Sequence, residues 1–287
     1  MRLTTLLEDI DGQTFEQVVR SLIDRVLISF KINTTSINPE EHSQIVSIAA
    51  FVVDPIKGEE LASFDETVHL TRKVEYQIRQ EDKTSDDMIG SISIRDMLNA
   101  ADYDIEDSYD NPNNEMDMLM RFKALVDDFR SRAILITHNA DFAMRHLDVA
   151  YGTDGIGGIP VIDTLQFTRT YMMPILHILA DQNHNQAIEM LEKLKSLTSP
   201  TLHDLGRALH VKMVRMGRAS TSAIEVRRLI KIFMSMIGFL YKNRKLYDSD
   251  EYTGTNSADK YESLPTEPLS TEPPSAEPPS AELSDDL

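Results

Sequence analysis

The stretch FKINTTSINPEEHSQIVSIAAFVVD, from Phe30 to Asp54, decides the fold. It contains the end of one apolar run, VLISFKI at residues 26–32, and all of a second run, QIVSIAAFVV at residues 44–53. Short runs rich in Val and Ile are typical of buried strands, and the Asn38-Pro39 pair between them is typical of a turn. A third strand is expected at residues 64–70, after a turn at Lys57-Gly58. Three consecutive strands predict an antiparallel meander.

Helical and strand patterns alternate after the meander. We expect a helix over residues 115–129, a strand at 133–137, a helix at 141–151 and a short strand at 160–163. The rest is predicted to be helical, over residues 163–171, 174–197, 201–209 and 223–247. A helical extension is also expected over residues 1–25, where Thr14 is placed to cap an amphipathic helix. This order of elements predicts an α/β fold in which helices flank a mixed five-stranded sheet over residues 26–247.

Charge is distributed unevenly along the chain. The 287 residues include 29 Lys and Arg against 47 Asp and Glu, a formal net charge of −18. Residues 248–287 hold eleven carboxylates and one lysine, so −10 of that charge lies on the tail and only −8 on residues 1–247. The tail repeats TEPLS, TEPPS and AEPPS from Thr266, and a segment rich in Pro, Glu and Ser is expected to be disordered. It could serve as a solubilising tail or as a docking motif for a partner.

Composition excludes several classes of protein. The chain has no Cys, which rules out disulfides, thiolate metal sites and a cysteine nucleophile. No apolar run approaches the roughly 20 residues of a membrane span, and no signal-peptide pattern is visible, so a cytoplasmic or otherwise intracellular protein is expected. The acidic stretch at residues 101–117 fails the calcium-loop pattern, because Asp107 and Asn113 stand where Gly and Glu are needed. We therefore expect an acidic insertion loop there.

Five segments carry a resemblance to a known family. Phe30–Asp54 resembles the first motif of the DEDDh 3′-to-5′ exonucleases, which have a ribonuclease H-like fold and are typified by the proofreading subunit of bacterial replicative DNA polymerase. ITHNADFAMRHL, from Ile136, resembles the second motif and the helix that it opens. VIDTLQFTR from Val161, TLHDLGRAL from Thr201 and GRASTSAIE from Gly217 follow in the order of the family's remaining segments. The resemblance spans residues 26 to 240 and implies a ribonuclease H-like exonuclease fold.

The resemblance also implies where catalytic residues should stand. In this family four carboxylates bind two divalent metals, and a His acts as general base. The two acids of the first motif fall on Lys31 and Asn33, and the acid of the second motif falls on Ala143. The His and the Asp of the third motif fall on Gly217 and Ser222. Because a lysine and four uncharged residues replace this chemistry, we expect no catalytic residue and no metal site at these positions.

The surrounding framework of the motifs is retained. Thr34 and Thr35 follow the first strand where the family contacts the terminal nucleotide, and His138 and Asn139 open the second-motif helix. Each can either contact a nucleotide or serve structure alone, Asn139 as a helix cap. Asp163 also matches the family, and capping of the helix that follows is its simplest role.

These observations favour a catalytically inactive exonuclease-like protein that acts as a scaffold or regulatory subunit in a nucleic-acid-processing assembly, with a protein partner. One alternative is an active metal-dependent exonuclease that uses other carboxylates with Mg²⁺ or Mn²⁺, since a fold alone does not fix function. Another is a protein that binds nucleic-acid ends without cleaving them. No cofactor is expected under the first hypothesis. An inserted helix expected at residues 175–197 either packs on the fold or offers a groove to a partner.

Overall fold

The computed structural model describes residue 22 and residues 24–39, 43–84, 93–108, 111–152, 155–195, 200–212 and 220–247. Structural statements below refer to these residues. Nearly all of the predicted N-terminal extension, the whole acidic tail at 248–287 and Gly217 lie outside them.

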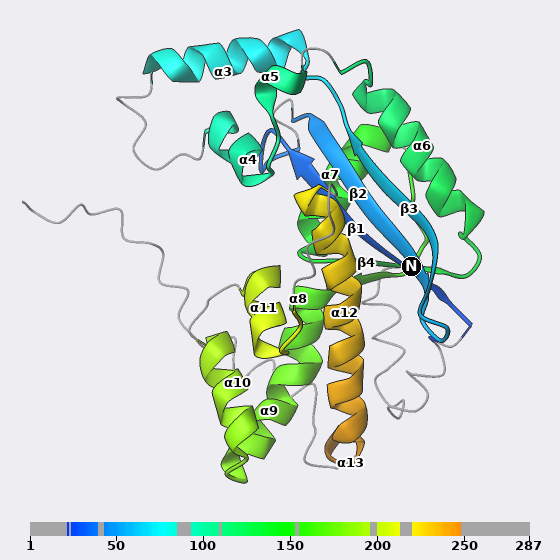
Figure 1. Cartoon of the computed structure of the whole chain (residues 1–287), viewed down its shortest axis with the longest axis vertical. Helices are drawn as coiled ribbons and strands as arrows, with labels where there is room; N and C mark the ends of the chain where they lie inside the picture. The colour runs from blue at the N-terminus through cyan, green and yellow to red at the C-terminus, as the bar shows by residue number, and fades with distance from the viewer. Residues whose placement is uncertain are drawn as a thin grey trace, which may run out of the picture.

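The core of the fold is a mixed five-stranded sheet (Figure 1). Its strands are β1 (Val26–Thr34), β2 (Ile45–Asp54), β3 (Glu59–Thr67), β4 (Ala133–Thr137) and β5 (Val161–Asp163), in the order β3-β2-β1-β4-β5. β2 is antiparallel to β1 and β3, whereas β4 is parallel to β1 and β5. This sheet, with helices on both faces, confirms the expected α/β class and the ribonuclease H-like topology.

The third strand begins earlier than predicted. β3 starts at Glu59 and ends at Thr67, not at residues 64–70. β3 is an edge strand of the sheet, and its first three residues are all exposed. The first half of the strand therefore lacks the continuous apolar pattern on which the prediction depended. Val68 and Leu70 follow the strand and are buried where the chain leaves the sheet.

Helices cover the two faces of the sheet with separate apolar cores. Residues of even number in β1 point toward α6 (Glu115–Asp128) and α7 (Ala140–Tyr151), in a core that includes Phe30 and Phe122. The other face is covered by α12 (Thr221–Lys242), which runs from beside the sheet to the lower end of the molecule in Figure 1 and is followed by α13 (Arg244–Tyr247). The same core includes α8 (Thr164–Phe167), a π-helical segment η2 (Thr168–Met172), α9 (Met173–Asp181), α10 (Asn185–Lys195) and α11 (Leu202–Ala208).

The prediction of one inserted helix over residues 175–197 is wrong, because the structure has two helices there, α9 and α10. The helical conformation ends between them, where Asn183 adopts a left-handed conformation with φ of 60°. The apolar residues of α10, among them Leu191 and Leu194, are buried in the core shared with α12. This pair of helices therefore packs on the fold, and its apolar side offers no groove to a partner.

An additional helical layer is inserted in the sequence between β3 and α6. It consists of α3 (Arg72–Thr84), α4 (Ile94–Ala100) and α5 (Ile105–Ser108), which pack over the start of β2 through a small core around Val46 and Leu70. Tyr103 is buried there, and its hydroxyl donates a hydrogen bond to the carbonyl of Val68. The prediction of a solvated loop over residues 101–117 is therefore wrong in part, because this stretch contains α5, the first residues of α6 and a buried tyrosine.

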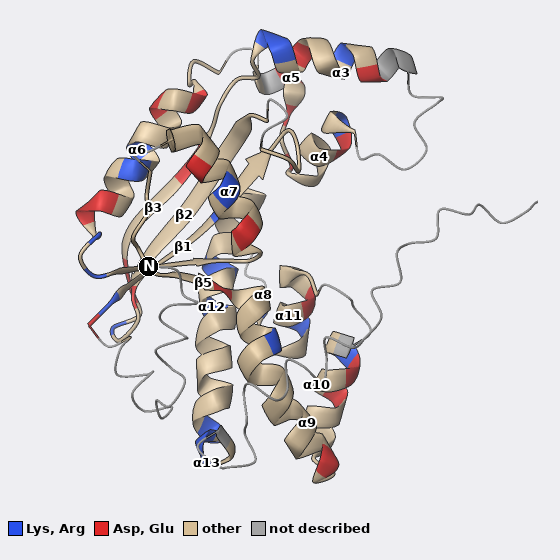
Figure 2. Cartoon of the chain, turned by 180° about the vertical axis from the view of Figure 1, so that it is seen from behind, with Lys and Arg blue, Asp and Glu red and all other residues tan. Residues whose placement is uncertain are grey.

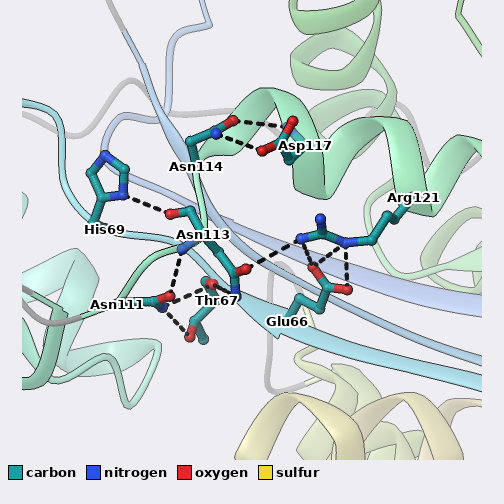
Figure 3. Close-up of polar contacts among 8 residues, drawn as sticks. All are labelled: Glu66, Thr67, His69, Asn111, Asn113, Asn114, Asp117 and Arg121. Carbon is teal, nitrogen blue, oxygen red and sulfur yellow. Dashed lines mark hydrogen bonds and ion pairs between the residues drawn. The ribbon is translucent and has the colours of Figure 1, made fainter.

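Polar contacts anchor the end of this layer to the edge of the sheet (Figure 3). His69 Nδ1 lies 2.6 Å from the carbonyl oxygen of Asn113, and the Asn111 amide donates to the carbonyl of Thr67 over 3.0 Å. Arg121 on α6 forms a two-point ion pair with Glu66 on β3. These contacts fix where the chain returns from the additional layer to α6. None of the described helices is both long and apolar enough to cross a membrane.

Candidate functional site

Strand β1 presents a row of polar side chains to α12. Side chains alternate between the two faces of a strand, so Ser29, Lys31 and Asn33 all point to the face that α12 covers. Ser29 Oγ donates to the Val226 carbonyl of that helix over 2.8 Å. On α12, Ser222, Glu225 and Val226 share one face, because residues three and four apart are neighbours on a helix. The two patterns bring the positions of the first and third motifs together.

Asn33 lies at the centre of an uncharged hydrogen-bond cluster. Its side-chain amide donates to Ser47 Oγ on β2 over 2.7 Å and to Ser222 Oγ on α12 over 2.9 Å. Asn33, Ser47 and Ser222 are 8%, 8% and 5% exposed. Buried polar groups require partners, and the two serine hydroxyls accept both amide protons. Two positions that carry metal-binding carboxylates in the resembled family therefore form a neutral link between sheet and helix.

Lys31 forms an ion pair with Glu225. The ammonium donates a short hydrogen bond to Glu225 Oε2, and the two side chains are 33% and 28% exposed. Lys31 thus points toward α12, where the resembled family has metal, and its charge is balanced by a carboxylate from the same helix. Glu225 was not predicted as its partner. The sequence did contain a signal for this pair. Lys31 is the next residue after Asn33 on the same face of the strand, and Glu225 is the next residue after Ser222 on the same face of the helix.

A second cationic side chain, Arg228, belongs to α12 itself and is more deeply buried than Lys31. Arg228 is 6% exposed and sits on Gly206 of α11, where an added Cβ would lie 2.2 Å from Arg228 Nη2. Its two terminal nitrogens approach the ring and the carbonyl of His203, both at 3.3 Å, while Nε has no hydrogen-bond partner among the described residues. Burial lowers the pKa of Arg228, and the nearby Glu225 carboxylate opposes this effect. Nothing in the sequence pattern pointed to this residue.

Ala143, the second-motif position, does not join this cluster. It lies on α7 and is buried in the apolar core that this helix shares with α6, on the face of the sheet opposite to Lys31 and Asn33. Two other carboxylates lie at the first turn of α12, where Asp65 accepts a hydrogen bond from Ser220 Oγ and Asp102 accepts one from Thr221 Oγ1. Both carboxylates therefore have hydroxyl partners that hold them at the helix end.

Thr34 and Thr35 have structural partners. Thr34 Oγ1 donates to the carbonyl of Ser36, and Thr35 Oγ1 accepts the backbone N–H of Gln44 at the start of β2. They are 4% and 3% exposed, so neither hydroxyl is presented to solvent. The Gln44 side chain continues the link, because its amide donates to His69 and accepts from Thr71. These contacts favour the structural alternative for the two threonines.

The second-motif helix begins differently from the prediction. α7 starts at Ala140, and Asn139 has a left-handed φ of 62° with no side-chain capping bond. Asn139 therefore occupies the N-cap position, as predicted, but its side chain does not supply the capping bond. Asp163, at the end of β5, accepts the backbone N–H groups of Asn139 and Ala140 over 3.0 and 2.9 Å, and also that of Leu165 over 2.8 Å. Asp163 thus caps α8, as predicted, and α7 as well.

His138 connects this corner to the start of α11. Its Nε2 lies 3.0 Å from the carbonyl oxygen of Pro200, so it donates, and its Nδ1 lies 3.0 Å from the hydroxyl of Thr164. Burial lowers the pKa of His138, which the nearby Asp163 carboxylate partly opposes. Both ring nitrogens are occupied by protein groups, which favours a structural role for His138.

The residues present do not fit the pair of divalent metals that the resemblance implies. Metal sites of this kind require several oxygen ligands, whereas Lys31 places an ammonium there. Among the described residues no group of three or more His, Asp or Glu side chains is arranged to hold a metal ion. A cavity of about 230 Å³ does exist, but it lies between α6 and α7, lined by Glu115, Met116 and Val149 among others. It is separate from the cluster around Lys31.

Comparisons with known proteins return structures only. No protein-family model and no curated protein sequence matches the chain. The solved structures to which it is similar include exonucleases. One is a 3′-exonuclease that recognises the 3′ end of the histone mRNA stem-loop, at 10% identity and a TM-score of 0.43, with 75% of this chain and 82% of that chain covered.

Two other similar structures are of proteins that this chain matches over a smaller share of their length. Cell-death related nuclease 4 matches at 11% identity and a TM-score of 0.44, over 76% of this chain and 65% of that one. Exonuclease I of E. coli, in complex with an oligonucleotide, matches at 11% identity and a TM-score of 0.40, over 76% of this chain and 43% of that one. This chain thus spans less than two thirds of both proteins.

Proposed function

We propose that this chain is a non-catalytic protein with an exonuclease-like fold, which acts as a scaffold or regulatory subunit in a nucleic-acid-processing assembly. The observation that carries the proposal is the arrangement of Lys31, Asn33, Ser222 and Glu225. An ion pair and a buried neutral cluster occupy the place where metal-dependent cleavage would need several carboxylates.

Electrostatics supports this reading of the site. A divalent metal beside an ammonium is repelled rather than bound, and the repulsion is large at contact distance in a partly buried site. Glu225 stands three residues after Ser222, the third-motif position, and its Oε2 already accepts a hydrogen bond from Lys31. Asp65 and Asp102 accept hydrogen bonds from the hydroxyls of Ser220 and Thr221, so recruiting them to a metal would break these bonds at the start of α12.

Cleavage is tested with the purified full chain, end-labelled single-stranded DNA and RNA, and Mg²⁺ or Mn²⁺. We expect no shortening of either substrate above a no-protein control. The matched variant is Glu225→Gln, which removes the carboxylate of the site while preserving its shape. Metal-dependent shortening that disappears in Glu225→Gln would refute the proposal and identify an active exonuclease with a displaced ligand.

Binding of ends is tested separately, because cleavage and binding fail independently. Oligonucleotides that carry a 3′-hydroxyl or a 3′-phosphate are titrated at low salt and at high salt, since phosphate contacts weaken as salt rises. We expect no discrimination between the two ends. Tight, end-specific binding without cleavage would replace the scaffold proposal by the end-binding alternative.

The scaffold role itself requires a partner. Affinity capture of the full chain from its native cell should recover proteins that process nucleic acid, and nuclease treatment of the extract should leave that recovery unchanged. Recovery that depends on intact nucleic acid would show co-retention rather than a direct subunit contact, and this outcome would contradict the proposal.

A further inference from the structure

The C-terminal end of the fold is basic and free of acids. From Val226 to Tyr247 the chain has six Lys and Arg and no Asp or Glu, although the protein as a whole carries a net charge of −18. Arg227 is paired with Glu60 and stacks over the ring of Phe51, and Arg228 is buried. The other four bases form what we call the basic end face, consisting of Lys231, Lys242, Arg244 and Lys245 (Figure 2 shows its blue end at α13).

Packing of α12 explains why these bases lie at the surface. Ile232, Phe233, Met236 and Leu240 are at most 2% exposed, so this side of the helix faces the core. Lys231, Met234 and Tyr241 recur at helical spacing on the opposite side, where Met234 is 40% and Tyr241 53% exposed.

The lysines of this face have no carboxylate partner. None of Lys231, Lys242 and Lys245 takes part in an ion pair within the described residues, whereas Lys31, Lys57, Lys123 and Lys193 each do. Arg244 stacks over the ring of Tyr241, with 4.6 Å between its guanidinium carbon and the ring centre. The face therefore carries a concentration of positive charge that the described part of the fold leaves uncompensated.

The segment that follows this face has the complementary charge. Residues 248–287 begin directly after α13 and hold eleven carboxylates and one lysine, with Glu262, Glu267, Glu272, Glu277 and Glu282 at a regular five-residue spacing. From Lys231 to Lys245 the helices extend about 21 Å at 1.5 Å per residue. A Pro-rich chain covers about 3.1 Å per residue, so roughly seven residues would span that length. The segment is several times longer than this.

We propose that the acidic segment 248–287 docks on the basic end face of its own chain and competes there with other polyanions, including nucleic acid. Covalent attachment at Tyr247 gives the segment an effective concentration of about millimolar, which a separate polyanion must exceed. Exposed charge pairs are individually weak and are screened by salt, so the docked segment holds the face through many exchanging contacts. This inference does not depend on the proposed function.

The absence of cysteine makes the contact measurable in the full chain. A nitroxide is attached at Ser270→Cys, and the methyl signals of methionine are recorded by NMR with the label oxidised and reduced. Met234 reports on the basic end face, and Met116 and Met120 on α6 are exposed controls on the other side of the sheet. At low salt we expect loss of Met234 intensity while Met116 and Met120 retain theirs. At 1 M salt, where the Debye length is about 3 Å, the Met234 signal should return.

Two matched variants separate docking from mere tethering. One replaces the five repeat glutamates named above by Gln and keeps the length and the label; the other is K231E/K242E/K245E. In both, Met234 should be attenuated no more than Met116. Equal attenuation of Met234 in the labelled parent and in the Gln variant would overturn the proposal. A single-stranded oligonucleotide that shifts Met234 equally in the parent and in the Gln variant would also overturn it, because the tail would then not compete.

Discussion

Asp163 holds the starts of two helices with one side chain. Its two carboxylate oxygens accept three backbone N–H groups from the first residues of α7 and α8. Loss of a capping side chain costs about 1 kcal/mol per helix, and loss of a negative charge near a helix N-terminus adds about 0.5 kcal/mol. Asp163→Ala should therefore lower the free energy of unfolding by about 2–3 kcal/mol.

The measurement is equilibrium unfolding in urea of the full chain, followed by circular dichroism. With a denaturant slope of about 3 kcal/mol per molar urea, the midpoint should fall by roughly 1 M. Asp163→Asn is the matched control, because it keeps one acceptor oxygen and should lose about half as much. A decrease below about 0.5 kcal/mol for Asp163→Ala would refute the reasoning, since the N–H groups would then be satisfied equally well by water.

Three further predictions concern buried polar groups. Gly206→Ala should destabilise the chain by about 1–3 kcal/mol, because the new Cβ meets the Arg228 guanidinium; in a background of Arg228→Met most of this cost should vanish in a double-mutant cycle. Tyr103→Phe should cost about 1 kcal/mol of unfolding free energy in urea, from the lost hydrogen bond to Val68. The pKa of His138 is lower in the fold than its ordinary value of about 6.5, so the unfolded chain binds more protons below that pH. Stability should therefore be full above about pH 6.5 and fall as the pH drops toward the folded-state pKa, and this slope should be shallower in His138→Gln; equal slopes would contradict the assignment.

The elements that the sequence predicts well are those whose pattern is local. β4 is found at Ala133–Thr137 as expected, and α7 within one residue, because each is a compact apolar pattern bounded by turn or capping residues. α3 was missed because Val74 and Ile78 are its only buried apolar residues. Their burial depends on contact with Val46 of β2, which no local pattern contains.

The site shows the same division. Alignment of the motifs located Lys31, Asn33 and Ser222, and the period-two and helical spacings bring these positions together. The partners could not be inferred, because a partner depends on how strand and helix cross. Glu225 meets Lys31. Asn139 occupies the N-cap position of α7, but the side-chain acceptor at that helix end is Asp163 of β5, which accepts the backbone N–H of Asn139 itself.

The partners also determine how the site responds to change. Replacing Lys31 alone by Asp would place two carboxylates opposite each other, because Glu225 remains on α12, and like charges at contact distance destabilise a partly buried site. Replacing Asn33 alone by a carboxylate would bury a charge that only Ser47 and Ser222 could solvate. Each single step toward a metal site therefore costs stability before any metal can bind. The ion pair and the neutral cluster each depend on partners from both the strand and the helix, so neither arrangement can be changed one residue at a time without leaving a charge or a polar group unpaired.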